Sequence, residues 1–439
     1  MVATVALIAA ALVAAAAPVG AQTAGSHSVG VVSETFVDKG RPTAANGDCA
    51  KIPSRALPTT IYYPAAGTGG STTAQENAAP DSSGGPYPLI VFSHGFGATA
   101  RTYTPLLGYL ASRGYVVAAP TFPLSSGDSP CGAIAGDFAN QPEDQSFVID
   151  SVLKQAAGKS GPLAGLVDRN EIGAAGHSNG AVTTYGLVAN SEVRDPRIDA
   201  AVVMAGTLQR YPKGRFDFAH APPMLLVHGT NDTLIPYDLG VAAYNQIRGP
   251  KGLLTITNGG HGSASGPDAY AASGDFFDAY LGGDTAAKAR LATDQVAGKS
   301  TMTFDAKQGS TTTLATVPRP EQHLKATVTP SKKLAGGQVV TVHWSGYTAG
   351  KVVNILQCNP TNRELANSAA CDYANAKLLQ PDPTGEGETQ LTIVEGPVGT
   401  GGVCDARHPG CFIVVNNASS SDPRDSVIVD ITFEKQPKQ

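Results

Sequence analysis

Short apolar runs alternate with helix-like segments through the middle of the chain. Runs such as 89–93 and 115–120 are apolar at nearly every position, which is typical of strands buried on both faces. The segments between them space apolar residues three or four positions apart, which predicts helices that bury one side. Strands are expected at 89–93, 115–120, 171–175, 198–205, 223–229 and 252–257, and helices at 103–112, 145–156, 181–189, 237–247, 268–281 and 285–291. This alternation favours right-handed crossovers and a doubly wound, mostly parallel α/β sheet with helices on both faces.

The two ends of the chain have a different pattern of apolar and polar residues. Residues 31–37 and 55–64 are candidate early strands, and 65–86 is rich in Gly, Ser, Thr, Ala and Pro and predicts a loop. After residue 311, short β-type segments separated by turn residues replace the helical periodicity, and we expect strands at 326–329, 339–344, 352–356, 389–393, 411–415 and 427–433. This pattern favours a small all-β sandwich. The expected domains are therefore 22–310 and 324–439, joined by a linker at 311–323.

The first 21 residues resemble a secretory signal of the bacterial type. The stretch from Val2 to Ala17 is apolar and rich in Ala, and small residues up to Ala21 offer a cleavage site before Gln22. No Lys or Arg precedes the apolar run, which departs from the usual pattern. The run is short for a membrane span, so we expect a secreted protein without a stable membrane anchor.

Composition narrows the classes of function further. A chain of 439 residues suggests two or three domains, and a formal charge of −5 with no basic cluster argues against nucleic acid as a partner. Six cysteines without a Cys-x-x-Cys pair favour disulfides over a structural metal in an exported protein. Cys49 and Cys131 are the only cysteines before residue 300, so they are expected to pair. We expect a monomer with neither metal nor organic cofactor.

The pentapeptide from Gly176 to Gly180 carries the strongest chemical signal. It reads Gly-His-Ser-Asn-Gly and lies between a predicted strand and a predicted helix, which is the setting of a nucleophile elbow. The turn leaves no room for side chains two positions before and after Ser178. Because glycine is abundant in this chain, the pentapeptide alone is equally compatible with chance, and its partners must decide.

An acid and a base follow in the chain order that such folds use. Asp232 follows the strand at 223–229, and His261 follows the strand at 252–257 within a glycine-rich loop. The carboxyl ends of parallel strands meet at one edge of a sheet, so Ser178, Asp232 and His261 are expected to converge there. Asp238 remains the alternative acid, although it is expected in the following helix. This arrangement would let His261 activate the serine and Asp232 orient His261.

Two backbone N–H groups are candidates for an oxyanion hole. The sequence His94-Gly95-Phe96-Gly97 follows the strand at 89–93, and the Phe96 N–H is expected to be one donor. The N–H of Asn179, directly after the proposed nucleophile, is expected to be the other. His94 and His177 are expected to hold the loop and the elbow. The short connection from Ser178 to Asp232 leaves no room for a large cap, so an open site with a small rim at 121–143 is expected.

Together these segments resemble the α/β-hydrolase superfamily. The closest branch contains enzymes similar to platelet-activating-factor acetylhydrolases, dienelactone hydrolases and bacterial polyester hydrolases or cutinases. The resemblance rests on residues 89–123, 176–180, 228–232 and 259–261, supported by 55–64 and 140–150, and covers about 250 residues. It is specific for the fold and the triad but weak for the substrate. A serine in place of the cysteine of true dienelactone hydrolases implies ordinary ester cleavage.

The C-terminal region resembles the neocarzinostatin family of immunoglobulin-like sandwiches. The resemblance rests on 326–331, 336–342 and the four cysteines after residue 357. It implies two short-range disulfides, Cys358–Cys371 and Cys404–Cys411. Family members bind an apolar chromophore, but no contact pattern for that ligand is visible here. A sandwich appended to a hydrolase serves as a spacer or as a module that binds substrate or an apolar ligand, and both roles stay open.

The sequence therefore predicts a secreted serine hydrolase that cleaves carboxylic esters of the lipid, short-chain or polyester type through an acyl-enzyme. One alternative is peptide or amide hydrolysis by the same three residues. A second alternative is a binding protein whose sandwich captures an apolar ligand. The sequence does not identify the natural substrate or its acyl length.

Overall fold

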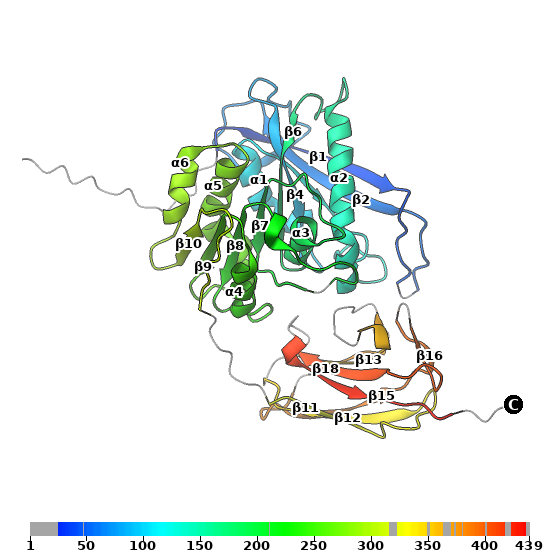
Figure 1. Cartoon of the computed structure of the whole chain (residues 1–439). Helices are drawn as coiled ribbons and strands as arrows, with labels where there is room; N and C mark the ends of the chain where they lie inside the picture. Colours follow the sequence, from blue (N-terminus) through cyan, green and yellow to red (C-terminus); the bar gives the residue numbers. More distant parts are fainter. Residues whose placement is uncertain are drawn as a thin grey trace, which may run out of the picture.

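The computed structural model describes residues 25–46, 48–209, 211–315, 323–348, 352–362, 370–372, 375–379, 381–399, 402–417 and 423–435. The predicted signal peptide at 1–21 and most of the predicted linker at 311–323 lie outside the described residues. The rest forms a large domain of helices and strands followed by a smaller region of strands, as Figure 1 shows. The expected order of an α/β domain and an all-β domain is thus confirmed.

Ten strands of the described residues form one sheet in the first domain, in the order β10-β9-β8-β7-β6-β4-β5-β2-β1-β3. The pairs from β5 through β4, β6, β7 and β8 to β9 are parallel, whereas β2 and β10 join the two flanks in antiparallel fashion. The strands are Ser28–Asp38 (β1), Arg55–Ala65 (β2), Ala74–Glu76 (β3), Tyr87–Ser93 (β4), Val116–Pro120 (β5), Val167–His177 (β6), Ala200–Met204 (β7), Met224–Gly229 (β8), Lys251–Ile256 (β9) and Ser300–Asp305 (β10).

Helices cover both faces of this sheet. Helices α2, α3 and α4 contribute to the core on one face, and α1, α5 and α6 to the core on the other. The helices are Thr104–Ser112 (α1), Gln141–Ala156 (α2), Asn179–Ala189 (α3), Tyr237–Gln246 (α4), Tyr270–Tyr280 (α5) and Thr285–Arg290 (α6). Short 3-10 helices lie at Ala100–Tyr103 (η1), Ala135–Asn140 (η2), Phe218–His220 (η3), His261–Ser265 (η4), Pro267–Ala269 (η5) and Leu291–Thr293 (η6).

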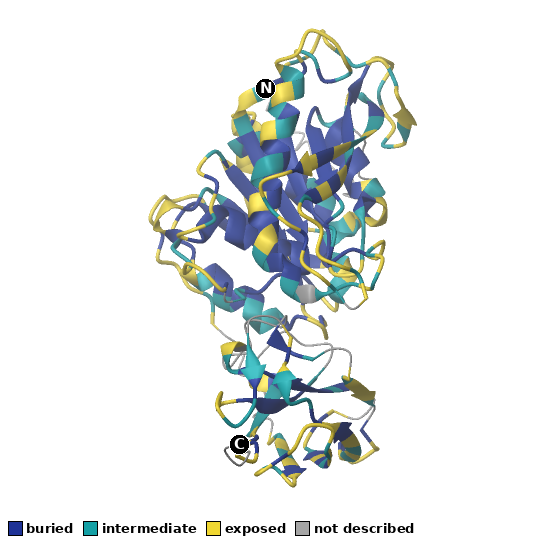
Figure 2. Ribbon diagram, turned by 90° about the vertical axis from the view of Figure 1, so that its right-hand side faces the viewer, coloured by how far each residue is buried: buried dark blue, intermediate teal, exposed yellow. Residues whose placement is uncertain are grey.

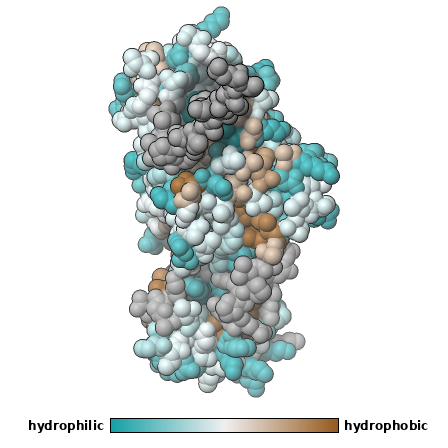
Figure 3. Space-filling view, turned by 90° about the vertical axis from the view of Figure 1, so that its left-hand side faces the viewer, coloured by the Kyte–Doolittle hydropathy of each residue, from teal (hydrophilic) through white to brown (hydrophobic). Residues whose placement is uncertain are grey.

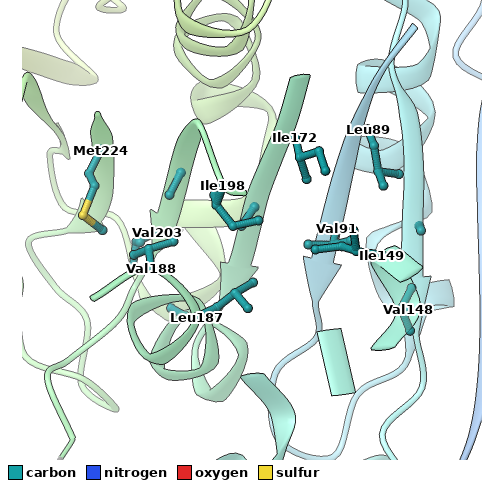
Figure 4. Close-up of a cluster of buried hydrophobic side chains, with 14 of the residues drawn as sticks. Leu89, Val91, Val148, Ile149, Ile172, Leu187, Val188, Ile198, Val203 and Met224 are labelled. Carbon is teal, nitrogen blue, oxygen red and sulfur yellow. The ribbon is translucent and has the colours of Figure 1, made fainter. Parts of the chain in front are cut away.

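The central strands are buried on both faces because their alternate side chains feed two separate cores. In β7, Ala201 and Val203 belong to one core, whereas Val202 and Met204 belong to the other. Figure 4 shows part of the first core, where side chains of β4, β6, β7 and β8 meet those of α2 and α3. In Figure 2 the strands of the first domain are largely buried, and exposed residues gather in the loops. This explains the unbroken apolar runs in the sequence.

The flanks of the sheet contain strands that the pattern did not predict. The edge strand β10 is half-buried and reads Ser-Thr-Met-Thr-Phe-Asp, so it lacks an apolar run. The short strand β3 lies inside 65–86, which was expected to be entirely loop. Helix α2 begins at Gln141 rather than at residue 145 because Pro142 occupies its first turn, where a missing N–H is tolerated.

The second domain packs two antiparallel sheets around a common core. One sheet has the order β11-β12-β15 and the other β14-β13-β18-β19, and the core contains Trp344 from the first and Ile413 from the second. A separate pair joins β16 and β17. The strands are Lys325–Thr329 (β11), Val339–Ser345 (β12), Val353–Cys358 (β13), Lys377–Leu379 (β14), Gly387–Thr392 (β15), Gly396–Pro397 (β16), Val403–Cys404 (β17), Phe412–Asn417 (β18) and Ser426–Asp430 (β19), with η7 at Pro360–Asn362 and η9 at Pro423–Asp425.

All six cysteines are paired. The disulfides are Cys49–Cys131, Cys358–Cys371 and Cys404–Cys411, which are the three expected pairs. Three disulfides indicate an extracellular protein, because reducing compartments do not maintain them. Among the described residues, no helix combines the length and the apolar character needed to cross a membrane.

Two contacts concern the junction between the domains. Leu314, inside the predicted linker, packs against the first domain and exchanges two hydrogen bonds with the side chain of Asn245. The start of the linker is therefore docked on the first domain. Arg424 of the second domain donates to the Asp238 carboxylate at the start of α4, at 2.9 Å. In Figure 3, apolar side chains gather on one side of the first domain, in the half nearer to the second domain.

Candidate active site

Ser178 occupies a strained turn between β6 and α3. Its φ of 58° and ψ of −122° are unfavourable for a residue with a side chain. A Cβ atom on Gly176 would lie 2.2 Å from the carbonyl oxygen of Gly180, and one on Gly180 would lie 2.0 Å from the carbonyl oxygen of Ser93. Both glycines are thus required by close backbone contacts. The strand–turn–helix context expected for a nucleophile elbow is present.

Ser178, His261 and Asp232 form one chain of hydrogen bonds. The Oγ of Ser178 lies 2.7 Å from Nε2 of His261, and Nδ1 of His261 lies 2.8 Å from Oδ2 of Asp232. A carboxylate can only accept, so Nδ1 donates to Asp232 and the neutral ring accepts the serine hydroxyl at Nε2. His261 begins η4 after β9, and Asp232 follows β8, so all three residues lie at the carboxyl edge of the sheet.

The Asp232 carboxylate is buried and heavily hydrogen-bonded. Its Oδ1 accepts the N–H groups of Leu234 and Ile235, both at 2.9 Å. Burial alone would raise its pKa, but hydrogen bonds from His228 and His261 outweigh burial and hold the pKa well below its usual range. Asp232 is therefore ionised at neutral pH. Asp238, the alternative acid, lies on α4 and contacts Arg424 instead.

His177 connects the elbow, the base and the loop after β4. Its Nε2 lies 3.0 Å from the carbonyl oxygen of His261, which can only accept, so Nε2 carries the proton. Its Nδ1 then accepts from the hydroxyl of Tyr103 at 2.9 Å, and that oxygen accepts the N–H of Gly95 at 3.0 Å. Burial, followed by the nearby His261, lowers the pKa of His177 to about 4, which keeps the ring neutral.

The loop after β4 is held by a second neutral histidine. Nε2 of His94 accepts the N–H of Phe122 at 3.0 Å, so Nδ1 donates to the carbonyl of Gly95 at 2.8 Å. Burial lowers the pKa of His94 to about 4. Tyr103 was not singled out in the sequence, because nothing in its local pattern shows that its hydroxyl reaches both Gly95 and His177.

The two expected oxyanion donors lie next to the serine. Asn179 directly follows Ser178 as the first residue of α3, and a Cβ atom on Gly95 would lie 3.2 Å from the Cβ of Ser178. Phe96 is the next residue in that loop, and its side chain is half exposed. Within the described parts of the chain, the backbone N–H groups of Phe96 and Asn179 have no hydrogen-bond acceptor. They are therefore available to a ligand oxygen.

The expected rim at 121–143 lies beside this loop. The N–H of Gly97 donates to the carbonyl of Ser125 at 2.8 Å, which ties the rim to the loop. At the other end of the rim, the buried guanidinium of Arg55 contacts Asp144 at 2.6 Å and Asp137 at 3.0 Å, fixing the start of α2. Across the described residues, no group of three or more His, Cys, Asp or Glu side chains is arranged to hold a metal ion.

Two family models match the chain. Residues 60–127 match the family described as platelet-activating factor acetylhydrolase, isoform II, and residues 326–433 match the neocarzinostatin family. No curated protein gives a significant match. The first match spans β4, the loop with Phe96 and β5, but ends before Ser178, so the roles of Ser178, Asp232 and His261 rest on geometry.

The first match supports a hydrolase of the esterase or lipase type, and both matches agree with the resemblances seen in the sequence. The ten-stranded sheet with helices on both faces agrees with the first, and the two packed antiparallel sheets agree with the second. The chain thus joins an α/β-hydrolase-like domain, which resembles the platelet-activating factor acetylhydrolases, to a neocarzinostatin-like domain.

Proposed function

We propose that this protein is a secreted serine hydrolase that cleaves carboxylic esters through an acyl-enzyme. The observation that carries the proposal is the hydrogen-bonded chain from Ser178 through His261 to Asp232, with Ser178 held on a strained turn. The family match of the first domain supports ester cleavage, and the three disulfides support an extracellular location.

The first half of the reaction forms the acyl-enzyme. Oγ of Ser178 attacks the ester carbonyl while Nε2 of His261 takes its proton, and Asp232 stabilises the imidazolium that results. The N–H groups of Phe96 and Asn179 donate hydrogen bonds to the negative oxygen of the tetrahedral intermediate. The imidazolium then gives its proton to the leaving alcohol, and the carbon–oxygen bond to that alcohol breaks.

The second half returns the free enzyme. Water enters where the alcohol left, His261 removes its proton, and the acyl–serine bond breaks with the proton returned to Ser178. His177 and Tyr103 hold the backbone of His261 relative to the loop with Phe96, so base and oxyanion donors keep one geometry through both halves.

Turnover of p-nitrophenyl acetate by the full chain tests this proposal. The Ser178→Ala variant is expected to lose at least about 10⁴-fold in kcat while remaining folded by circular dichroism, because no other group replaces the nucleophile. A p-nitroanilide of the same acyl group measures the amide alternative, and its turnover is expected to be far slower. Wild-type turnover in a folded Ser178→Ala variant would show that another residue is the nucleophile.

A further inference from the structure

The first domain contains a cavity of about 540 Å³, and Ser178, Asp232 and His261 are not among its lining residues. Its floor is one face of the ribbon formed by β1 and β2, where Ser33, Thr35, Ala56, Pro58 and Thr60 point the same way. We call this cavity, with its lining residues, the trough. In Figure 1, β1 and β2 run to the right-hand side of the domain, and the chain between them loops downward. The ribbon extends past the end of β5, whose last residue pairs with Thr59.

The walls of the trough are fixed covalently and by hydrogen bonds. The Cys49–Cys131 disulfide joins the loop between β1 and β2 to the rim after β5. Nδ2 of Asn46 also donates to the carbonyls of Cys131 and Gly132, at 3.2 and 2.7 Å. Within the loop, backbone hydrogen bonds join Thr43 to Ile52. A cavity held in this way is already formed before a ligand binds, which lowers the entropic cost of binding.

The trough lies on the same edge of the sheet as Ser178. The strand order from the elbow outward is β6, β4, β5, β2 and β1. Neighbouring strands are about 4.8 Å apart, so β2 lies about 14 Å from β6 and β1 about 19 Å. The loop with Phe96 connects the two places: a Cβ on Gly95 would lie 3.2 Å from the Cβ of Ser178, and Thr99 at the other end of the loop lines the trough. An extended substrate can span this distance.

The lining combines apolar groups with unused hydroxyls. Ala44, Ile52, Ala56, Pro123 and Leu124 supply apolar surface, and Ile52 is 53% exposed. In the described structure, several lining residues have side-chain hydroxyls with no hydrogen-bond partner, among them Ser33, Thr35, Thr60 and Thr121. Ser33 and Thr60 are direct partners in the β1–β2 register, so two of these hydroxyls lie side by side.

Few charges face the trough. Arg101 and Asp128 pair with each other at 3.3 Å and are both exposed, which leaves Glu34 as the remaining charged residue in the lining. A ligand with strong charge is therefore not matched. A plain hydrocarbon would leave these hydroxyls without acceptors once water is displaced, which costs free energy. A chain of apolar segments interrupted by carbonyl oxygens satisfies both features of the surface.

We propose that the trough binds the distal part of an extended ester substrate, an aliphatic chain that carries ester carbonyls at intervals, as in an oligoester. This inference rests on the proposed function, because it places the scissile ester at Ser178 and the following repeat units across Phe96 and Gly97. The apolar segments pack on Ala56 and Ile52, and Ser33 and Thr60 donate hydrogen bonds to carbonyls along the chain.

A substitution that fills the trough with a larger side chain tests the inference. Ala56→Phe adds a ring on the exposed floor, and Ala45→Phe, at an exposed alanine outside the lining, is the matched control. Ala56→Phe is expected to lower kcat/KM about tenfold or more on a soluble caprolactone oligomer, while p-nitrophenyl acetate and p-nitrophenyl palmitate react as with wild type. Ala45→Phe is expected to match wild type on all three. Equal turnover of the oligomer by both variants and wild type would overturn the inference.

A second variant tests the hydroxyls without filling space. Thr60→Val keeps the shape of the side chain and is expected to lower kcat/KM on the oligomer about three- to tenfold, with acetate turnover unchanged. An equal loss on palmitate with Ala56→Phe would assign the trough to a hydrocarbon chain and contradict the role of the hydroxyls.

Binding separates this inference from the proposed function. Calorimetry with the Ser178→Ala protein measures affinity for the caprolactone oligomer without turnover, and adding Ala56→Phe is expected to weaken it about tenfold. If wild type hydrolyses no ester but the oligomer still binds and Ala56→Phe weakens it, the proposed function fails and the trough remains a site for such chains. If esters are hydrolysed and Ala56→Phe leaves oligomer binding unchanged, the inference about the trough fails alone.

Discussion

The carboxyl edge of the large sheet has two halves of different construction. At the ends of β6, β8 and β9, Ser178, Asp232 and His261 are joined by hydrogen bonds of 2.7 and 2.8 Å, and the Asp232 side chain is fully buried. At the ends of β5, β2 and β1, the trough is broad, weakly charged and lined by hydroxyls without partners. We refer to these as the elbow half and the trough half.

The difference between the halves follows from what each would do. Proton transfer and oxyanion stabilisation require groups held in one geometry, so the elbow half holds its three side chains through hydrogen bonds to a buried carboxylate and leaves two backbone N–H groups free for the oxyanion. A flexible chain with repeated units needs area and scattered donors, and the trough half supplies these on an ordinary strand face. Changes in the elbow half are therefore expected to affect every substrate, and changes in the trough half only extended ones.

Apart from the loss of Ser178, the substitution in the elbow half that is expected to lower kcat most is that of Asp232. Asp232→Asn is expected to lower kcat about 10³- to 10⁴-fold on short and long esters alike, because the amide neither holds the His261 tautomer nor stabilises its charged form. Steady-state kinetics on p-nitrophenyl acetate measure this loss.

Asp238→Asn is the matched control, since Asp238 is the alternative acid from the sequence and contacts Arg424 rather than His261. This variant is expected to stay within about twofold of wild type, as is usual for a group outside the reacting array. A greater loss in Asp238→Asn than in Asp232→Asn would move the acid to Asp238 and contradict the geometry.

A smaller effect is expected on stability in acid. The pKa values of His94 and His177 are lowered from 6.5 to about 4 in the folded protein, mainly by burial. Between about pH 4 and 6.5, each of these histidines is protonated in the unfolded chain but neutral in the folded chain. The free energy of unfolding therefore falls as the pH decreases from about 6.5 to 4. Each pKa unit is worth about 1.4 kcal/mol, so each ring accounts for up to about 3 kcal/mol of this fall.

Urea unfolding at a series of pH values measures this dependence. Together the two rings lower the free energy of unfolding as the pH decreases from about 6.5 to 4. His177→Phe and His94→Phe are each expected to remove about half of this decrease, and the double variant nearly all of it. A dependence on pH that is the same in both single variants as in wild type would show that these rings titrate alike in the folded and unfolded chains.

The smallest effect belongs to the trough half. The losses in kcat/KM expected on the oligomer are about tenfold or more for Ala56→Phe and about three- to tenfold for Thr60→Val, and short esters are unaffected. If Ala56→Phe lowered acetate turnover as strongly as oligomer turnover, the two halves would be one site, and the comparison between them would fail.

The sequence predicted those features that depend on local pattern. The central strands were recognisable as strands because both of their faces are buried. The convergence of Ser178, Asp232 and His261 at one edge of the sheet followed because each comes directly after such a strand. The choice between Asp232 and Asp238 needed the structure, since only the path of the loop after β8 decides which carboxylate meets Nδ1 of His261.

Other features depend on contacts between distant segments. Tyr103 reaches Gly95 and His177 through the fold of three separate segments, and no spacing in the sequence encodes that contact. The trough requires the β1–β2 ribbon, its loop and the rim to be joined by the Cys49–Cys131 disulfide. The edge strand β10 was missed because a half-buried strand with polar residues has no apolar run.

The central claim is that Ser178 is the nucleophile of an acyl-transfer site, and covalent labelling tests it most directly. The full chain is treated with diethyl p-nitrophenyl phosphate, which transfers a phosphoryl group to activated serines, and the adduct is located by peptide mass spectrometry. One adduct per chain on Ser178 is expected, with none in the folded Ser178→Ala variant and strongly slowed labelling in Asp232→Asn. Labelling of a different residue, or equal labelling of Ser178→Ala, would contradict the account.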